Sequence, residues 1–201
     1  MAFVNTKNRE IQAKIVYYGP GRGGKTTNLE YLYNKFKARV KSELVTIKTH
    51  GDRTLFFDFF PFDVGTINGY DVKIQLYTVP GQVKYDATRR LVLRGVDGIV
   101  FVADSMAVRR EKNVLSLRNL QENLKTFNRS IFKVPIVLQY NKKDLAEQGI
   151  PLLPLQTLEK DLNSQLRAPT FEASALTGLN VLPTMKKIIS ITVASLFKEL
   201  K

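Results

Sequence analysis

The stretch GPGRGGKT at residues 19–26 decides the fold of this 201-residue chain. It has the spacing GxxxxGK followed by Thr, and it lies between an apolar run, IQAKIVYYG at 11–19, and an amphipathic stretch at 23–40. Glycines at these positions let backbone N–H groups turn inward and form an anion-binding nest that leads into a helix N-terminus. The pattern therefore predicts a strand, a phosphate-holding loop and a helix, in that order.

The same loop predicts how a nucleoside triphosphate and its metal would be held. Lys25 is expected to neutralise the β- and γ-phosphates, and the Thr26 hydroxyl to ligate Mg²⁺. The alternative is a glycine-rich turn that only caps a helix, but strand, loop, Lys-Thr pair and helix are all present, which favours the nucleotide. The expected nucleotide-binding residues of this loop are Gly19, Gly21, Arg22, Gly23, Gly24, Lys25, Thr26 and Thr27.

Apolar runs alternate with longer amphipathic stretches along the whole chain, which is typical of a βα-repeating parallel sheet. We expect one α/β domain over residues 1–201, a three-layer P-loop NTPase with a mostly parallel six-stranded sheet and one antiparallel strand. The antiparallel pair is predicted by Asn68-Gly69, a strong hairpin signal. The expected strands are 11–19, 53–62, 70–79, 95–105, 134–141 and 168–174, and the expected helices are 23–40, 108–128, a short one after Pro151 and Pro154, and 179–200.

A second motif, NKKD at residues 141–144, follows the predicted strand at 134–141. Ligands bind at the carboxyl ends of strands in open α/β sheets. The Asp144 carboxylate can accept two hydrogen bonds from the N1–H and N2–H₂ edge of guanine, whereas adenine would leave it unpaired. Lys142 can lie along the base and Asn141 can tie this loop to the phosphate loop. A polar turn is the alternative, but the phosphate loop upstream favours guanine recognition.

A third segment, EASAL at 172–176, ends the last predicted strand. Backbone N–H groups near Ser174 and Ala175 are expected to meet the guanine O6, with Leu176 beside the base. This short segment is weak evidence when taken alone.

The composition of the chain argues against several other classes of function. The chain has no cysteine, which excludes disulfides and thiolate chemistry, and no apolar stretch long enough to span a membrane. We expect a cytoplasmic protein without a lipid anchor, because the sequence has neither a myristoylation nor a prenylation signal. The net charge is +13 without a run of five like charges, so lysines that solvate helix faces are favoured over a nucleic-acid target.

Together these residues resemble the Ras-like small GTPases, and most closely their bacterial MglA-type group (mutual gliding protein A). The similar segments are IVYYGPGRGGKTTN at 15–28, DRTLFFDF at 52–59, LYTVPGQ at 76–82, LRGVDGIVFVADS at 93–105 and NKKDL at 141–145. The resemblance implies a GTP/GDP switch that hydrolyses GTP with Mg²⁺, a roadblock-fold (MglB-type) GTPase-activating partner, and polarity or motility effectors. It also implies recruitment to a cell pole or to the inner face of the membrane through partners.

Two positions depart from most Ras-like proteins. Their third motif carries an aspartate that holds Mg²⁺ through water, whereas this chain has Thr78 there, in a TVPG form that is itself an MglA-type trait. Asp58 is a candidate substitute for that carboxylate, although a structural ion pair would explain it equally well. Leu176 replaces a lysine that commonly packs on the base.

The resemblance also implies catalytic roles. Gln82 corresponds to the water-orienting glutamine beside Gly81, Thr54 to the switch threonine that senses γ-phosphate and Mg²⁺, and Arg53 to an arginine finger supplied by the same chain. The first switch is expected over residues 39–52, ordered by triphosphate and loosened by diphosphate, and the second over 81–90. The alternatives are a GTP-dependent scaffold with negligible hydrolysis and a basic nucleic-acid-binding GTPase.

Overall fold

The computed structural model describes residues 3–37, 45–49, 53–82 and 85–199, and their side chains except at 3, 45–49, 53–60 and 62. The strands are β1 (Phe3–Asn5), β2 (Glu10–Tyr18), β3 (Val45–Thr49), β4 (Arg53–Ile67), β5 (Tyr70–Thr78), β6 (Gly98–Asp104), β7 (Ile136–Asn141) and β8 (Thr170–Glu172). The α-helices are α1 (Lys25–Phe36), α2 (Asp86–Leu93), α3 (Arg110–Lys125), α4 (Leu155–Leu162) and α5 (Val181–Glu199), and the 3-10 helices are η3 (Ala107–Arg109) and η4 (Lys143–Gln148).

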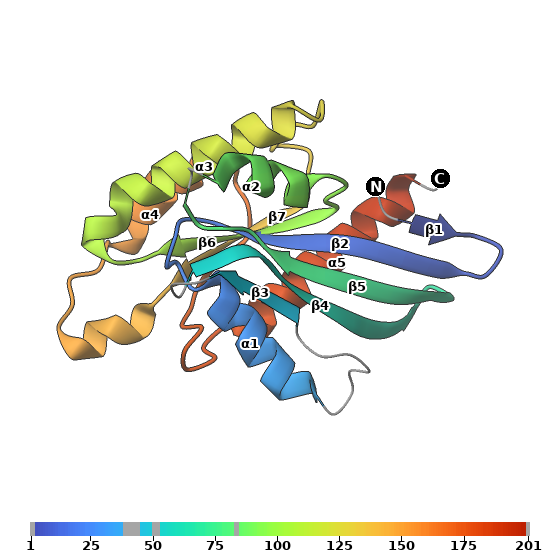
Figure 1. Ribbon diagram of the computed structural model, residues 1–201, viewed down its shortest axis with the longest axis horizontal. Helices are drawn as coiled ribbons and strands as arrows, with labels where there is room; N and C mark the ends of the chain where they lie inside the picture. Colours follow the sequence, from blue (N-terminus) through green and yellow to red (C-terminus); the bar gives the residue numbers. More distant parts are fainter. Residues whose placement is uncertain (1–2, 38–44, 50–52, 83–84, 200–201) are drawn as a thin grey trace.

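One mixed sheet runs through the molecule in the order β3-β4-β5-β2-β6-β7-β8, with helices on both faces (Figure 1). The pairs β5-β2, β2-β6, β6-β7 and β7-β8 are parallel, which confirms the α/β fold class. β6 and β7 are buried along their whole length, as expected for central strands covered on two faces.

Alternate residues of β2 feed two separate cores. Ile15 and Tyr17 pack with α1 and α5 on one face, while Val16 and Tyr18 pack with α2, α3 and α4 on the other. This alternation follows from the two-residue period of a strand. Because both faces are packed, a register slip would move polar side chains into a core, and the register is well specified.

The predicted hairpin is confirmed between β4 and β5. Ile67 pairs with Tyr70, and the two residues between them, Asn68 and Gly69, both have positive φ, at 50° and 79°. Two left-handed residues define a type I′ turn, whose twist matches that of the flanking strands.

The structure differs from the sequence expectation in three elements. β1 adds an antiparallel strand beside β2, and β3 adds another beside β4, so the described sheet has eight strands where six were expected. β3 lies within the segment 39–52 predicted as the first switch, of which residues 39–44 and 50–52 lie outside the described residues, and its sequence VTIKT has the β-branched residues that favour strands. Helix α2 was not among the expected elements; it begins at Asp86, within the residues 81–90 predicted as the second switch, and has Val92 and Leu93 buried at its end, while the switch role stays a prediction.

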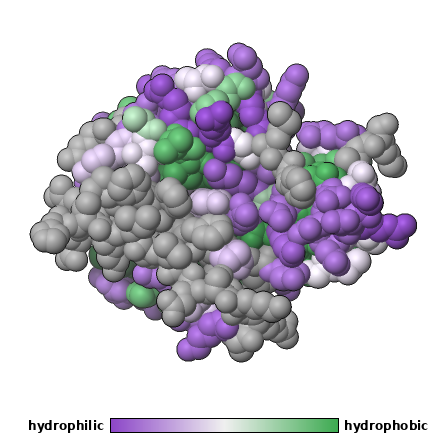
Figure 2. Space-filling view, turned by 45° about the vertical axis from the view of Figure 1, so that its right-hand side comes forward, coloured by the Kyte–Doolittle hydropathy of each residue, from purple (hydrophilic) through white to green (hydrophobic). Residues whose placement is uncertain are grey.

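The described surface in Figure 2 is largely hydrophilic, with hydrophobic side chains in small separate patches. Within the described residues, no helix is both long enough and apolar enough to cross a membrane. The parallel strands β2, β5, β6, β7 and β8 all end at the same edge of the sheet, and the loops that follow them meet there. This edge is where the strand order reverses around β2, the usual position of a ligand in an open α/β sheet.

Candidate nucleotide-binding site

A cavity of about 610 Å³ opens at this edge of the sheet, within the range of small-molecule sites. It is lined by Gly21, Arg22, Gly24, Lys25, Thr26, Thr27, Val79, Gly81, Gln82, Tyr85, Asn141, Lys142, Asp144, Leu145, Ala175 and Leu176. The structure therefore brings together thirteen of the predicted site residues, from four different loops. Val79, Tyr85 and Leu145 were not singled out; Val79 and Leu145 lie inside the quoted segments LYTVPGQ and NKKDL, which could have pointed to them.

The phosphate loop has the backbone of an anion-binding nest. Arg22 has φ of 61° and Gly24 has φ of 96°, both in the left-handed region. Helix α1 then begins at Lys25, and no side chain caps its first turn. The first N–H groups of a helix need partners, and together with the helix dipole they favour a phosphate at this place.

At two positions of the loop only glycine fits, because neighbouring atoms leave no room for a Cβ. A Cβ on Gly24 would lie 2.1 Å from Nδ2 of Asn141, and one on Gly19 would lie 2.2 Å from the carbonyl oxygen of Val102. Gly19 is thus held against β6 and Gly24 against the end of β7. Gly19 and Gly23 do not line the cavity. Both lie close to the Val102 carbonyl oxygen of β6, so they belong to the part of the loop that packs against the sheet.

Lys25 lies over the phosphate loop with its side chain largely buried. Its Nζ donates to the carbonyl oxygens of Pro20, at 2.8 Å, and Gly19, at 3.3 Å. A Cβ on Gly81 would lie 2.9 Å from this Nζ and 2.2 Å from Gly21 Cα, so the loop after β5 touches the phosphate loop beside the lysine. A Cβ on Gly21 would in turn lie 3.6 Å from Gln82 Cγ, which places Gln82 against the same loop.

Asn141 joins three loops by its amide group. Its Nδ2 donates to the Gly23 carbonyl oxygen at 2.8 Å, and its Oδ1 accepts from the Ala175 N–H at 2.8 Å. The side chain is buried, so both bonds are shielded from water. The hydrogen bond to Gly23 is the predicted link between the loop at 141–144 and the phosphate loop, and the bond from Ala175 connects Asn141 to the loop at 172–176.

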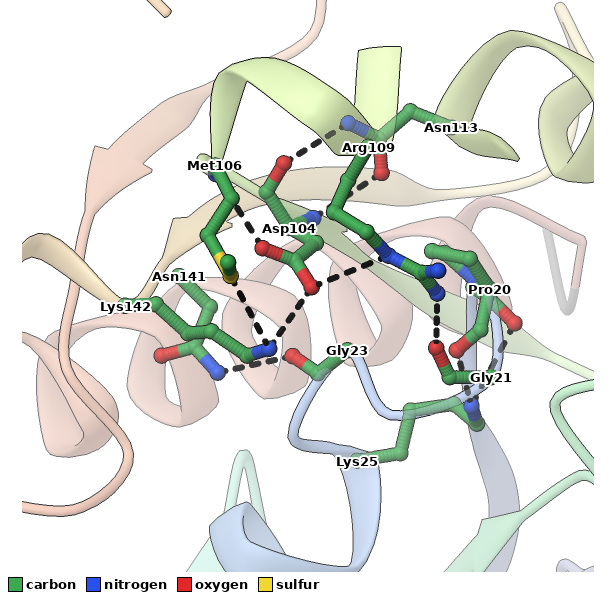
Figure 3. A network of polar contacts seen from close by, with 11 residues as sticks. Pro20, Gly21, Gly23, Lys25, Asp104, Met106, Arg109, Asn113, Asn141 and Lys142 are labelled. Atoms are coloured by element: carbon green, nitrogen blue, oxygen red, sulfur yellow. Dashed lines mark hydrogen bonds and ion pairs between the residues drawn. The ribbon is translucent and has the colours of Figure 1, made fainter. Parts of the chain in front are cut away.

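Asp104, at the end of β6, connects the loop after β7 to the phosphate loop through ion pairs with Lys142 and Arg109 (Figure 3). Its Oδ2 lies 2.7 Å from Lys142 Nζ and 3.4 Å from Arg109 Nε. Arg109 Nη2 donates to the Gly21 carbonyl oxygen at 2.5 Å. Neither Asp104 nor Arg109 was singled out from the sequence, although a charged residue directly after the apolar run GIVFVA is a signal for a strand end at the site.

The base end of the cavity contains Asp144, in the 3-10 helix η4, and Leu176, which is 72 % exposed. Lys142 has φ of 73°, and this left-handed residue turns the chain out of β7 into η4. The Ser174 N–H donates to the Leu179 carbonyl oxygen and the Ala175 N–H to Asn141. Both N–H groups expected to meet guanine O6 thus have partners in the protein, and Ser174 is buried outside the cavity lining.

Arg89 of helix α2 connects the loop after β5 to the core, and its side chain is fully buried. Its Nη1 donates to the Gly81 carbonyl oxygen at 3.0 Å, its Nη2 to Ser116 Oγ at 3.0 Å and its Nε to the Tyr18 hydroxyl at 2.9 Å. The guanidinium also lies 4.3 Å from the centre of the Tyr18 ring, a cation–π contact. Burial raises the pKa of Tyr18, so its hydroxyl stays neutral as the arginine's acceptor.

The donors beside the phosphate loop fit a magnesium ion held mainly by phosphate oxygens and water. Thr26 lines the cavity next to Lys25, and Mg²⁺ in nucleotide sites keeps several waters beside few protein ligands. Asp144 is the one carboxylate in the cavity lining of the described part. Within that part, no group of three or more His, Asp or Glu side chains is arranged to hold a metal, so Thr26 would contribute a hydroxyl oxygen.

Three of the predicted residues lie on β4, in a part of the strand for which the structure describes the backbone but not the side chains. Arg53 and Thr54 pair with Thr49 and Lys48 of β3, and Asp58 pairs with Thr46. The roles expected for Arg53 and Thr54 in catalysis and metal binding, and for Asp58 as a substitute carboxylate, stay predictions. Thr78 is fully buried at the end of β5.

The fold and this cavity define a P-loop protein in which the loop at residues 19–26 and the NKKD segment at 141–144 line one cavity. The sequence matches the model of the Ras family over residues 14–193. The chain belongs to this family of small GTPases, which in general bind guanine nucleotide and Mg²⁺. It is also 48 % identical over 198 residues to the mutual gliding-motility protein MglA of Myxococcus xanthus, covering 98 % of this chain and 99 % of that protein. The MglA-type resemblance is therefore confirmed.

Proposed function

We propose that this protein is a GTP/GDP-controlled switch that hydrolyses GTP to GDP and phosphate. The observation that carries the proposal is that the phosphate loop and Asp144 line one cavity, with Asn141 bonded to Gly23 of the phosphate loop on one side and to Ala175 on the other. Such a cavity reads the two ends of one ligand, a guanine base and a phosphate chain. Magnesium, when bound with the nucleotide, neutralises charge on the phosphates.

Four residues of the chain have separate roles in hydrolysis. Lys25 neutralises charge on the β- and γ-phosphates once it exchanges the Gly19 and Pro20 carbonyl oxygens for phosphate oxygens. Gln82, which lies against the phosphate loop, orients the attacking water. Arg53 stabilises the negative charge that spreads over the transition state, and Thr54 senses the γ-phosphate and the metal. The roles of Arg53, Thr54 and Gln82 rest on the family resemblance.

The biological role that we propose is regulation of bacterial cell polarity or gliding motility. Its support is the 48 % identity to a protein named for mutual gliding motility. The expected partners are a roadblock-fold (MglB-type) GTPase-activating protein and polarity or motility effectors. We propose a cytoplasmic protein that partners recruit to a cell pole or to the inner face of the membrane.

Single-turnover hydrolysis tests the catalytic assignment. Gln82→Leu and Arg53→Ala should each slow hydrolysis at least about tenfold, because each removes a group that acts mainly in the transition state, while GTP affinity stays near that of the wild type. Gln156→Leu and Arg118→Ala, which change exposed residues of α4 and α3, are the matched controls. Hydrolysis at the wild-type rate in both test variants would contradict their roles.

Base specificity is tested separately with Asp144→Asn. An amide offers one donor and one acceptor, so it pairs with the N1–H and the C2 carbonyl of xanthine but leaves the guanine amino group without an acceptor. The variant should bind GDP at least about tenfold more weakly and xanthosine diphosphate more tightly than the wild type does. An unchanged preference for GDP would show that Asp144 does not read the base.

A GTP-dependent scaffold that hydrolyses negligibly is the second candidate, because the buried Thr78, where most Ras-like proteins carry an aspartate, suits either function. Measuring turnover with and without an activating partner separates the two. Persistently bound GTP under both conditions would support the scaffold.

A further inference from the structure

Arg109 contacts the phosphate loop from behind, outside the cavity. Gly21 and Arg22 line the cavity, whereas Arg109 and Asp104 do not. Figure 3 shows the Arg109 side chain reaching from η3 to the Gly21 carbonyl oxygen, which faces the guanidinium. Arg109 belongs to neither of the sequence motifs that mark the site.

The contact fixes the direction of one peptide group. The Gly21 carbonyl and the Arg22 N–H belong to the same peptide, and no described peptide bond is cis. In a trans peptide these two groups point in opposite directions. With the carbonyl held on Arg109, the Arg22 N–H points the other way, into the nest. A cation on the carbonyl also polarises the peptide and strengthens its N–H as a donor.

The position of Arg109 is itself fixed by a carboxylate without solvent exposure. Asp104 Oδ2 lies between Arg109 Nε and Lys142 Nζ, and its Oδ1 accepts from the Met106 N–H at 3.1 Å. Asn113 of α3 holds the backbone of Asp104, accepting from its N–H at 2.9 Å and donating to its carbonyl oxygen at 2.8 Å. A buried carboxylate shared by two cations holds both side chains in place.

We propose that Arg109 is a positioning residue for GTP hydrolysis: it holds the Gly21–Arg22 peptide with its carbonyl outward, so that the Arg22 N–H faces the bound phosphates. This inference rests on the proposed function. Negative charge moves onto the departing diphosphate during hydrolysis, and a donor already aimed at the phosphates stabilises it without reorganisation. Asp104 aligns this phosphate-side cation with Lys142 on the base side.

Arg110 provides a matched control one residue along the chain. Its guanidinium forms an ion pair with Asp161 at 2.6 Å on the surface, away from the phosphate loop. Arg109→Gln and Arg110→Gln remove the same charge from neighbouring positions, but only the first releases the Gly21 carbonyl. Arg109→Lys keeps a cation that can reach either the carbonyl or Asp104 but lacks the fork that joins them.

The experiment measures single-turnover GTP hydrolysis, the rate of GDP dissociation and the ³¹P NMR shift of the β-phosphate of bound GDP in all three variants. Arg109→Gln should slow hydrolysis about tenfold or more, because a misdirected donor loses part of the two to three orders of magnitude that one transition-state donor contributes. Arg110→Gln should stay within about twofold of the wild type, as expected for a surface ion pair. Arg109→Lys should lie between them. The ³¹P signal should move in Arg109→Gln and not in Arg110→Gln.

Equal hydrolysis rates in Arg109→Gln and Arg110→Gln would overturn the inference. So would slow hydrolysis in Arg109→Gln with an unchanged ³¹P shift, since that pattern is expected of a general structural defect. If the wild type itself does not hydrolyse GTP, the proposed function fails; a ³¹P signal that still moves in Arg109→Gln and not in Arg110→Gln would then show separately that Arg109 orients the peptide that faces the phosphates.

Discussion

Replacing Arg89 by methionine removes a buried cation while keeping a side chain of similar length. Arg89 has no solvent exposure, and its nearest partners are the Tyr18 hydroxyl, the Gly81 carbonyl oxygen and Ser116 Oγ. None of these groups carries a formal charge, so the fold keeps this arginine through hydrogen bonds and the Tyr18 ring. The substitution tests how much those contacts contribute to the free energy of unfolding.

The magnitude follows from the groups that lose a partner. Tyr18 keeps its bonds to Asn119 and Asn123, but the Gly81 carbonyl oxygen and Ser116 Oγ lose the arginine. A buried polar group without a partner costs about 1–3 kcal/mol; Ser116 is buried whereas Gly81 is only partly buried, so the pair costs about 2–5 kcal/mol. Loss of the cation–π contact adds about 1–2 kcal/mol. Relief from burying a charge offsets several kcal/mol. We expect a net loss of about 2–4 kcal/mol.

Urea unfolding followed by circular dichroism at one saturating GDP concentration measures this loss, since bound nucleotide stabilises the folded state by mass action. The midpoint should fall by about 1–2 M urea with an unchanged slope. Arg90→Met is the control: Arg90 is half exposed, pairs with Asp86 four residues earlier in the chain, and should cost less than about 1 kcal/mol. A loss below about 1 kcal/mol for Arg89→Met, or one equal to that of Arg90→Met, would refute this reasoning.

Two further predictions concern Asn141 and Asp86. Asn141→Ala removes both hydrogen bonds that the amide makes between loops; it should destabilise the fold by about 2–5 kcal/mol and speed GDP dissociation about tenfold. The control is Asn163→Ala, which removes a buried amide that bonds the Ala168 backbone in another part of the fold. It should lower stability without speeding GDP dissociation. Burial raises the pKa of Asp86, but hydrogen bonds from Asn119, Asn123 and Arg90 outweigh it and hold that pKa below its usual range. The ionised carboxylate therefore stabilises the fold above its unfolded pKa of about 4, and this contribution is lost as pH falls further. Urea unfolding between about pH 3 and pH 7 measures this effect: as pH falls, the free energy of unfolding should decrease less steeply in Asp86→Asn than in the wild type. Parallel curves for the two proteins would contradict the assignment.

Local spacing was enough to predict the phosphate loop, the base-reading loop and the β4–β5 hairpin. In each case a few neighbouring residues set the backbone: glycines before α1 and a Lys-Thr pair at its start, Asp144 just after β7, and Asn68-Gly69 in a type I′ turn. The two added strands were missed for different reasons. β1 has three residues, too few for a periodic pattern, whereas VTIKT of β3 has strand-forming residues but lies in a segment interpreted as a switch.

The sequence by itself determined the kind of site, because the residue types that hold phosphate and read guanine are coded in short motifs. Only the tertiary structure decided how the phosphate loop is supported. Gly23 meets Asn141, 118 residues later, and Gly21 meets Arg109, 88 residues later. Those contacts depend on the order of β2, β6 and β7 in the sheet, which brings the ends of distant strands together. Strand order arises from packing across the whole domain, so no local pattern encodes which side chain will hold the loop.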